Sequence, residues 1–342
     1  MRLPRLKAPA DLPVAYYHCL SRVVDRQFVL GDPEREKFVE LLRQYEAFCQ
    51  VRVITYCVMS NHFHVLLEIP QRPAEVTMSD EAIVTHLRSI YSPMQLAAVR
   101  TQLDLFRTAG AHEAADAYKA SILARMWDVS AFMKLVKQRF TQWFNRIHQR
   151  KGTLWEERFK SVLVEGAGEA LWAMAAYIDL NPVRAGMVDD PKDYRWCGYA
   201  EGVAGGKAAQ QGLRAVVEAQ SAQPESHATQ VLGSYRTLLF VAGKEEGLDE
   251  ATQRALRRGF SRKQIEAVLK ARGTLSWGQM LRCRVRYFSD GVALGTREFV
   301  DHIFHSERQR FATRRKSGAR PLRQLDAGGL RTLRDLRIQA LG

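Results

Sequence analysis

The chain has 342 residues, of which 46% are apolar and 26% charged, and its formal net charge is +14. No apolar run approaches the roughly 18 residues of a membrane span, and the basic N-terminus lacks the apolar segment of a secretory signal. Five scattered cysteines without CxxC spacing argue against a disulfide framework or a zinc knuckle, so we expect a reducing, cytoplasmic location.

The chain begins with a β–α–β–β pattern. Residues 14–24, 51–60 and 62–69 are rich in β-branched, aromatic and aliphatic side chains, which predicts three strands. A possible capping residue, a proline in the first turn and apolar residues at helical spacing predict a helix over residues 31–50. The short link between the second and third strands predicts an antiparallel hairpin.

The next segment differs in kind. Residues 71–128 are polar, Ala-rich and helical in pattern, so we predict an inserted helical subdomain. After it we predict an amphipathic helix over residues 130–151, a fourth strand over 158–165, and a helix over 168–181 that ends before Pro182.

The positive charge is concentrated in the C-terminal part. Residues 206–342 contain 25 Lys and Arg against 13 Asp and Glu, whereas residues 1–205 contain 26 against 24. A Gly/Ala/Gln/Ser-rich stretch marks a possible linker, so residues 206–342 are predicted to form a second, mainly helical domain. Its helices are expected over 248–273 and 295–311, followed by a basic segment. The excess charge favours a nucleic-acid partner and association with the nucleoid, with a solvated basic surface as the alternative.

Two histidines share one face of the third predicted strand. His62 and His64 are two residues apart, so their side chains point the same way and that of Phe63 points the other way. Two imidazoles can hold a divalent metal ion but need a third ligand from elsewhere in the chain. The pattern alone leaves two interpretations open: a metal site, or a pair of hydrogen-bonded structural histidines.

The predicted helix over residues 168–181 carries Tyr177 and Asn181 four residues apart, hence on one face. An Asn oxygen is a suitable hard ligand for Mg²⁺ or Mn²⁺, and a tyrosine one turn earlier would stand beside that ion. By spacing alone, a half-buried aromatic residue and an ordinary last helical residue before Pro182 are the alternative.

Four motifs occur in order along the chain: YYHCLSR, YCVMSNHFHVLLE, RFKSVLVE and YIDLNPVRAGMV. Together they resemble the REP-associated tyrosine transposases, which are HUH endonucleases related to single-tyrosine insertion-sequence transposases. The resemblance covers roughly residues 10–200 apart from the insertion. It implies an α+β fold with a ferredoxin-like βαββαβ core and an antiparallel sheet. The catalytic domain would span residues 1–205, with the insertion at about 71–128 and a mostly helical domain after it.

The resemblance also implies site roles. His62, His64 and Asn181 would bind Mg²⁺ or Mn²⁺, and Tyr177 would attack a phosphodiester of single-stranded or hairpin DNA, as found in repeated palindromic elements. The products would be a 5′-phosphotyrosine link and a free 3′-hydroxyl that can reverse the reaction. We expect a monomer. The alternatives are a catalytically silent DNA-binding protein on the same fold, and another HUH activity such as replication initiation, against which the lack of a P-loop argues.

Basic residues near the predicted site would hold the DNA backbone, with ordinary surface salt bridges as the alternative. The candidates are Arg22, Arg158, Lys160 and Arg184, and in the C-terminal basic segment Arg314, Arg315 and Lys316.

Overall fold

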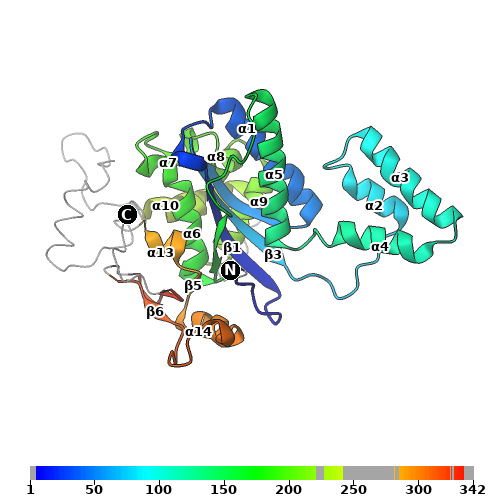
Figure 1. Ribbon diagram of the computed structural model, residues 1–342. Coiled ribbons are helices and arrows are strands. Elements are labelled where there is room, and N and C mark those ends of the chain that lie inside the picture. Colours follow the sequence, from blue (N-terminus) through cyan, green and yellow to red (C-terminus); the bar gives the residue numbers. More distant parts are fainter. Residues whose placement is uncertain are drawn as a thin grey trace.

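The computed structural model describes residues 5–220, 227–241, 281, 285–323, 325 and 327–334. Four strands on one side of its sheet have the order β2-β3-β1-β4, and each neighbouring pair is antiparallel (Figure 1). They are β1 (Val14–Arg22), β2 (Arg52–Val58), β3 (His62–Pro70) and β4 (Lys160–Val164). The four predicted strands are confirmed, and β2 and β3 form the predicted hairpin.

Two helices cover one face of these strands. α1 (Asp32–Cys49) follows β1 and α5 (Val129–Ile147) precedes β4, which completes a βαββαβ order. Phe38 of α1 packs against Phe63 of β3 and Phe140 of α5, with ring centroids 4.5 and 5.3 Å away, and all three side chains are fully buried. The α+β fold with a ferredoxin-like core is therefore confirmed.

A second layer of helices packs on the opposite face. α6 (Gly168–Asp179) lies on β2 and β3, and α9 (Lys207–Glu218) lies on β2. α9 approaches the strand closely, because a Cβ at Gly212 would stand 2.3 Å from the carbonyl oxygen of Ile54. Residues just after the expected boundary at 206 thus pack on the sheet of the first domain. The remaining elements of this layer and its turns are α7 (Asn181–Arg184), η2 (Pro191–Asp193), α8 (Gly198–Val203) and α10 (Ala228–Val241).

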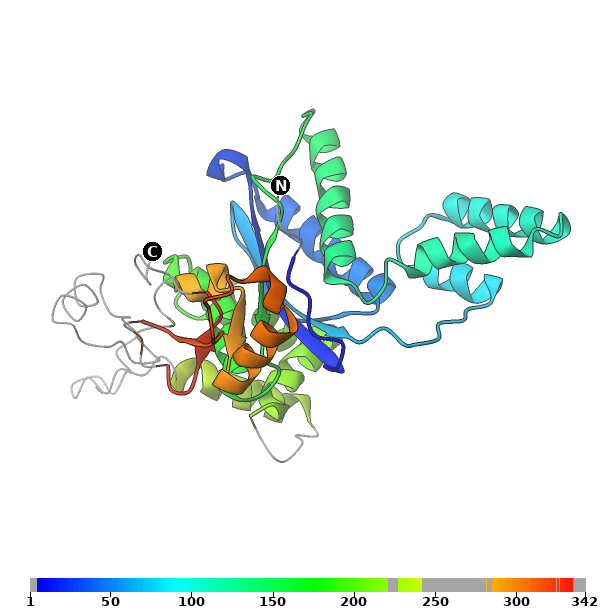
Figure 2. The same ribbon diagram turned by 60° about the horizontal axis from the view of Figure 1, so that its bottom comes forward.

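The C-terminal part of the chain extends the same sheet. β5 (Ala293–Gly295) pairs in parallel with β4, and β7 (Arg331–Thr332) and β6 (Arg320–Pro321) follow it, giving seven strands in the order β2-β3-β1-β4-β5-β7-β6 (Figure 2). Two short helices, α13 (Arg286–Asp290) and α14 (Arg297–Ser306), flank β5. The described residues after 206 therefore include strands as well as helices.

Two predictions about this part have different outcomes. The helix predicted over 295–311 is present as α14, followed by the turn η3 (Arg308–Arg310), while Gly295 ends β5. The helices predicted over 248–273 lie outside the described residues. Within the described ranges, no helix is both long and apolar enough to cross a membrane.

The insertion after β3 is helical, as predicted. α2 (Asp80–Leu87), α3 (Pro93–Thr108) and α4 (His112–Leu123) pack on one another and stand to one side of the sheet (Figures 1 and 2). A hydrogen bond of 2.7 Å between His86 Nε2 and the carbonyl oxygen of Phe48 links α2 to the end of α1.

Candidate active site

The two histidines of β3 point to the sheet face that carries α6. Phe63, between them, is fully buried on the α1 and α5 side, so the alternation of the strand places His62 and His64 on the other side. Their ring centroids are 5.2 Å apart, edge to face. His64 is buried at 5% exposure, whereas His62 at the start of the strand is partly exposed. The predicted shared face is confirmed.

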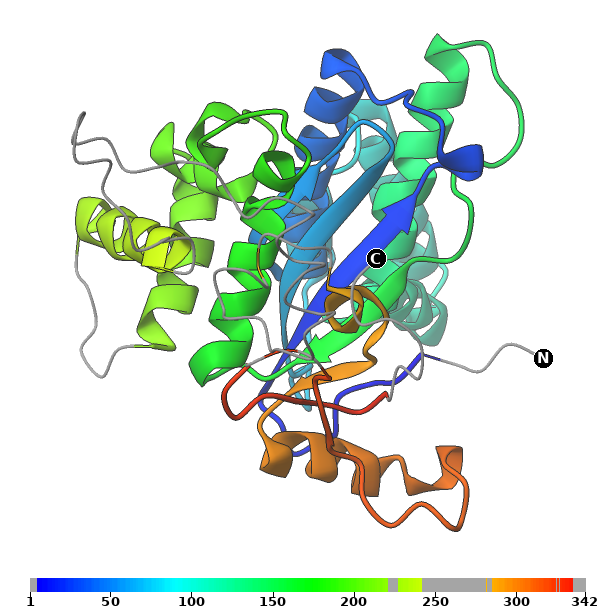
Figure 3. The ribbon, with the colours of Figure 1, turned by 90° about the vertical axis from the view of Figure 1, so that its left-hand side faces the viewer.

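Tyr177 reaches the histidines from α6, a helix of the layer that packs on β2 and β3 opposite α1 and α5 (Figure 3 shows the two helical layers). Its ring centroid lies 6.1 Å from that of His64, edge to face, and 5.0 Å from that of Phe288 in α13. The guanidinium carbon of Arg184 stands 4.1 Å from the centre of the Tyr177 ring. Residues from β3, α6, α7 and α13 therefore meet at one place, and Tyr177 itself is only 2% exposed there.

Asn181 begins α7, one turn after Tyr177. The helical run breaks at Leu180, so α6 ends before Asn181 and Pro182 occupies the first turn of the next segment, where its missing N–H costs nothing. The Nδ2 atom of Asn181 is buried and has no hydrogen-bond partner among the described residues. An amide without a partner is free to present its oxygen instead, because the two ends of the group are interchangeable in shape.

These residues fit Mg²⁺ or Mn²⁺. Two imidazoles and an amide oxygen are acceptable ligands for both ions. Within the described part of the chain, no group of three or more His, Cys, Asp and Glu side chains is arranged to hold a metal ion. The buried amide of Asn181, whose Nδ2 has no partner among the described residues, is a group of a different type that can supply an oxygen ligand.

Sequence reasoning missed His18 of β1. This side chain is fully buried, its Nε2 lies 2.8 Å from Nδ1 of His64, and its Nδ1 lies 2.7 Å from the carbonyl oxygen of Phe288. Leu20 of β1 is paired with His64, so His18 is its diagonal neighbour on the same face. Strand alternation in YYHCLSR could have indicated a face for His18, but the pairing register that brings it to His64 has no sequence signal.

Burial keeps the two inner imidazoles neutral. It lowers the pKa of His18 to about 4, although the hydrogen bond that His18 makes to the Phe288 carbonyl opposes the shift; the positive charge of Arg184 adds a smaller lowering effect. Burial also lowers the pKa of His64 well below its usual range, assisted by the neighbouring His18 and His62. Both rings are therefore neutral at pH 7, the form in which an imidazole binds a metal ion.

His62 is held by its neighbour in the β2–β3 turn. Its Nδ1 lies 2.7 Å from Oδ1 of Asn61, and the amide nitrogen of Asn61 donates to the carbonyl oxygen of Arg26 at 2.9 Å. Arg26 belongs to the turn η1 (Val24–Arg26), in which Asp25 and Arg26 both adopt the left-handed region, with φ of 54° and 55°. This conformation is costly for residues with a Cβ, so the contact with Asn61 helps to hold the turn against the site.

The basic candidates are distributed unevenly around this site. Arg22 ends β1 opposite His62, and Arg184 covers Tyr177 while donating to the carbonyl oxygen of Leu281 at 3.0 Å. Arg158 is exposed just before β4. Lys160 forms an ion pair of 2.9 Å with Asp290 of α13, so the surface salt bridge considered as its alternative is present.

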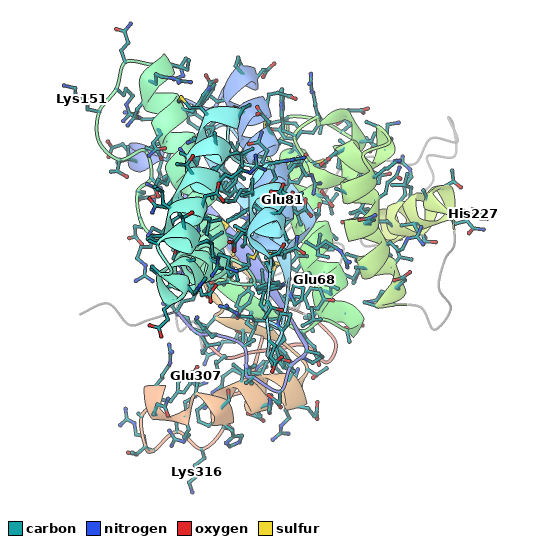
Figure 4. The ribbon with its side chains drawn as sticks, turned by 90° about the vertical axis from the view of Figure 1, so that its right-hand side faces the viewer. Glu68, Glu81, Lys151, His227, Glu307 and Lys316 are labelled. Atoms are coloured by element: carbon teal, nitrogen blue, oxygen red, sulfur yellow. The ribbon has the colours of Figure 1, made fainter. Side chains whose placement is uncertain are left out.

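The three basic residues of the C-terminal segment lie on the loop after α14. Arg314 and Lys316 are exposed, and Figure 4 shows Lys316 at the outer edge of the molecule. Arg315 differs, because its guanidinium donates to the carbonyl oxygens of Ser317, Gly318 and Leu333 and thereby ties the loop to the end of the sheet.

Comparison with models of known families agrees with the motifs. Residues 12–100 match the family model described as "Transposase IS200 like". Among solved structures, one similar chain is a REP-associated tyrosine transposase bound to a REP hairpin. It is 12% identical, the match covers 66% of this chain and 95% of that one, and the TM-score is 0.38. No curated protein matches the chain. The resemblance to this group of transposases, first seen in the motifs, is confirmed by the family match over residues 12–100.

Proposed function

We propose that this chain, whose residues 12–100 match the family model of IS200-like transposases, cleaves and rejoins single-stranded or hairpin DNA through Tyr177. The observation that carries the proposal is the meeting of Tyr177 with His64, at 6.1 Å between ring centroids, from elements far apart in the sequence. The proposed substrates are repeated palindromic elements, because the motifs resemble transposases associated with such repeats.

The reaction would be a transesterification. The phenolic oxygen of Tyr177 gives up its proton and forms a bond to phosphorus, the bond from phosphorus to the 3′ oxygen breaks, and the released oxygen takes up one proton to become a 3′-hydroxyl, so the proton count balances. The 5′-phosphotyrosine link keeps the energy of the broken ester, so attack by a 3′-hydroxyl rejoins DNA without ATP. Arg184, which lies over the Tyr177 ring, is placed to stabilise negative charge on the transferring phosphate.

His62, His64 and Asn181 would hold Mg²⁺ or Mn²⁺ beside the tyrosine. When bound, that ion supplies charge stabilisation to the non-bridging oxygens of the phosphate. The protein residues do the rest: the strand fixes the two imidazoles, and α6 orients the phenol. Because one chain supplies the tyrosine and both histidines, we propose that the site is assembled in cis and that a monomer is sufficient.

A silent DNA-binding protein is the second candidate. The burial of Tyr177, at 2% exposure under Arg184 and Phe288, favours it, because a nucleophile must reach its phosphate. The two functions share a fold and a partner but differ in one product, the covalent adduct.

Incubation of the protein with end-labelled hairpin DNA and Mn²⁺ or Mg²⁺, followed by a denaturing gel, separates the two candidates. We expect a labelled band at the mass of a protein–DNA adduct, abolished by EDTA and by Tyr177→Phe. Tyr118→Phe, on α4 of the insertion, is the matched control and should leave the band unchanged. The absence of any adduct from the wild-type protein across a panel of hairpins would contradict the enzyme proposal.

A further inference from the structure

A chain of two hydrogen bonds joins His64 to the backbone of α13. His64 Nδ1 and His18 Nε2 are 2.8 Å apart, and His18 Nδ1 and the carbonyl oxygen of Phe288 are 2.7 Å apart. The two rings are nearly parallel, with centroids 5.0 Å apart and an interplanar angle of 15°. His18 is fully buried, so water does not compete for either bond.

The carbonyl group at the end of this chain fixes every proton in it. A carbonyl oxygen only accepts, so Nδ1 of His18 must carry the proton and donate to Phe288. The Nε2 atom of a neutral His18 then accepts, and the only group it can accept from across 2.8 Å is Nδ1–H of His64. Nε2 of His64 is left without a proton, as a ligand nitrogen must be.

We propose that His18 is a positioning residue that holds His64 in the Nδ1–H form and in the ring orientation set by the Phe288 carbonyl. The inference rests on the proposed function, because that function makes His64 a metal ligand. The hydrogen-bond chain itself is present in the protein without metal or DNA. His18 touches neither and acts only through His64.

His62 shows the same arrangement independently. The Asn61 amide nitrogen must face the Arg26 carbonyl, because only a donor can bond to that oxygen. The amide oxygen therefore faces Nδ1 of His62, which must donate, and in the neutral form of this ring Nε2 is the nitrogen without a proton. Both candidate ligands thus have their protonated nitrogen fixed by a backbone carbonyl, through one intervening side chain each.

The arrangement makes α13 part of the site. The chain just after Phe288 is held to β4, because Leu163 N donates to the carbonyl oxygen of Val292 at 2.8 Å and the side chain of Lys160 pairs with Asp290 at 2.9 Å. The β4–β5 pairing therefore determines where the Phe288 carbonyl stands. We infer that this C-terminal segment, beyond any contribution to DNA binding, supports the affinity of the site for metal ions.

The test uses the full chain with ¹⁵N-labelled histidine, free of metal. The imidazole ¹⁵N shifts of the wild-type protein should show His64 protonated at Nδ1, and His18→Phe should shift that proton toward Nε2. In parallel, the dissociation constant for Mn²⁺ should rise about 10- to 100-fold in His18→Phe, the usual cost of losing such a second partner. His18→Gln, which keeps an acceptor for His64, should restore most of the affinity.

A control variant and the wild-type shifts separate this inference from the function on which it rests. His86→Phe removes another histidine–carbonyl bond, a partly buried one in the insertion, and should leave Mn²⁺ binding unchanged. Should His18→Phe lose its fold by circular dichroism, the decision falls to His18→Gln and to the wild-type shifts. A wild-type His64 protonated at Nε2, or unchanged Mn²⁺ affinity in a folded His18→Phe, would overturn the inference. If the ¹⁵N shifts and the Mn²⁺ affinities are as expected but no DNA adduct forms, the role of His18 is supported and the strand-transfer proposal is contradicted.

Discussion

Two segments extend beyond the ferredoxin-like core, and they are attached in different ways. The insertion α2–α4 is the next part of the chain after β3, yet it stands to one side of the sheet (Figure 1). A hydrogen bond from His86 of α2 to the carbonyl oxygen of Phe48 connects it to the end of α1. The segment from α13 to β7 behaves differently. Its residue Phe288 comes 270 residues after His18, and the Phe288 carbonyl oxygen nevertheless accepts a hydrogen bond from His18. Among the described residues, no hydrogen bond or ring contact joins α2–α4 to His64 or Tyr177.

The difference lies in backbone pairing. β5 is joined to β4 by hydrogen bonds from Leu163 N and Glu165 N, at 2.8 and 2.9 Å, so α13 is fixed against the strands that carry the site. Helices α2–α4 pack mainly on one another, so among the described residues no backbone pairing with the sheet fixes their position relative to the site. Sheet pairing, and not distance in the sequence, decides which addition can influence the site.

The largest effect should come from Phe288→Ala. This change removes a fully buried ring that contacts Tyr177, while leaving the carbonyl that bonds to His18. We expect a loss of about 3–5 kcal/mol in the free energy of unfolding. Because Tyr177 loses a packing partner, we expect its phenol to be misplaced by about 1 Å. A misplacement of that size should lower the rate of adduct formation by about 100-fold. Denaturant titration and single-turnover gels measure the two quantities.

Phe288→Leu is the control for that variant, since it keeps apolar volume beside Tyr177. It should retain most of the stability and of the adduct rate. A destabilised Phe288→Ala protein with a normal adduct rate would show that the ring does not position the tyrosine.

Leu103→Ala makes the equivalent cavity in the insertion, where Leu103 of α3 is 1% exposed. The local stability of α2–α4 should fall by about 2–5 kcal/mol, measured by hydrogen exchange of their amides. The amides of β1 and β3 and the rate of adduct formation should not change, because no hydrogen bond or ring contact among the described residues joins α2–α4 to His64 or Tyr177. A parallel loss of adduct would mean that the insertion takes part in holding DNA.

The smallest effect concerns the pH dependence of the insertion. Hydrogen bonds from Arg107, and secondarily from Lys119, hold the pKa of Asp80 well below its usual range. A lowered pKa stabilises the folded form above the unfolded-state value of about 3.9, and this contribution is lost as the pH falls further. Protection factors of α2–α4 should therefore decrease below about pH 4 in the wild-type protein. In Asp80→Asn these protection factors should depend less on pH. The same pH dependence as in the wild-type protein would show that Asp80 is not the group responsible.

The sequence was sufficient for the core and for part of the site. Alternating and helical patterns predict the βαββαβ order, and period two alone places His62 and His64 on the face opposite Phe63. The role of His18 could not be predicted, because it depends on the β1–β3 register and on a backbone carbonyl. Every residue has a backbone carbonyl group, so no sequence pattern indicates which carbonyl accepts the hydrogen bond.

The C-terminal strands were missed for a related reason. β5 has three residues and β6 and β7 have two each, which is too short for any periodicity to appear. Basic composition likewise could not distinguish Arg315, which binds three carbonyl groups of its surroundings, from the exposed Arg314 and Lys316 beside it. Composition predicts the charge of a segment, while the structure shows how each charge is used.

The central claim is that Tyr177 is the nucleophile, and peptide mapping tests it most directly. The protein is incubated with hairpin DNA and Mn²⁺, denatured, and treated with nuclease and protease, and the peptides are sequenced by tandem mass spectrometry. We predict a nucleotide joined through its 5′-phosphate to Tyr177 and to no other residue. A nucleotide on another tyrosine, such as Tyr16 or Tyr17 of β1, or an adduct that persists in Tyr177→Phe, would contradict the claim.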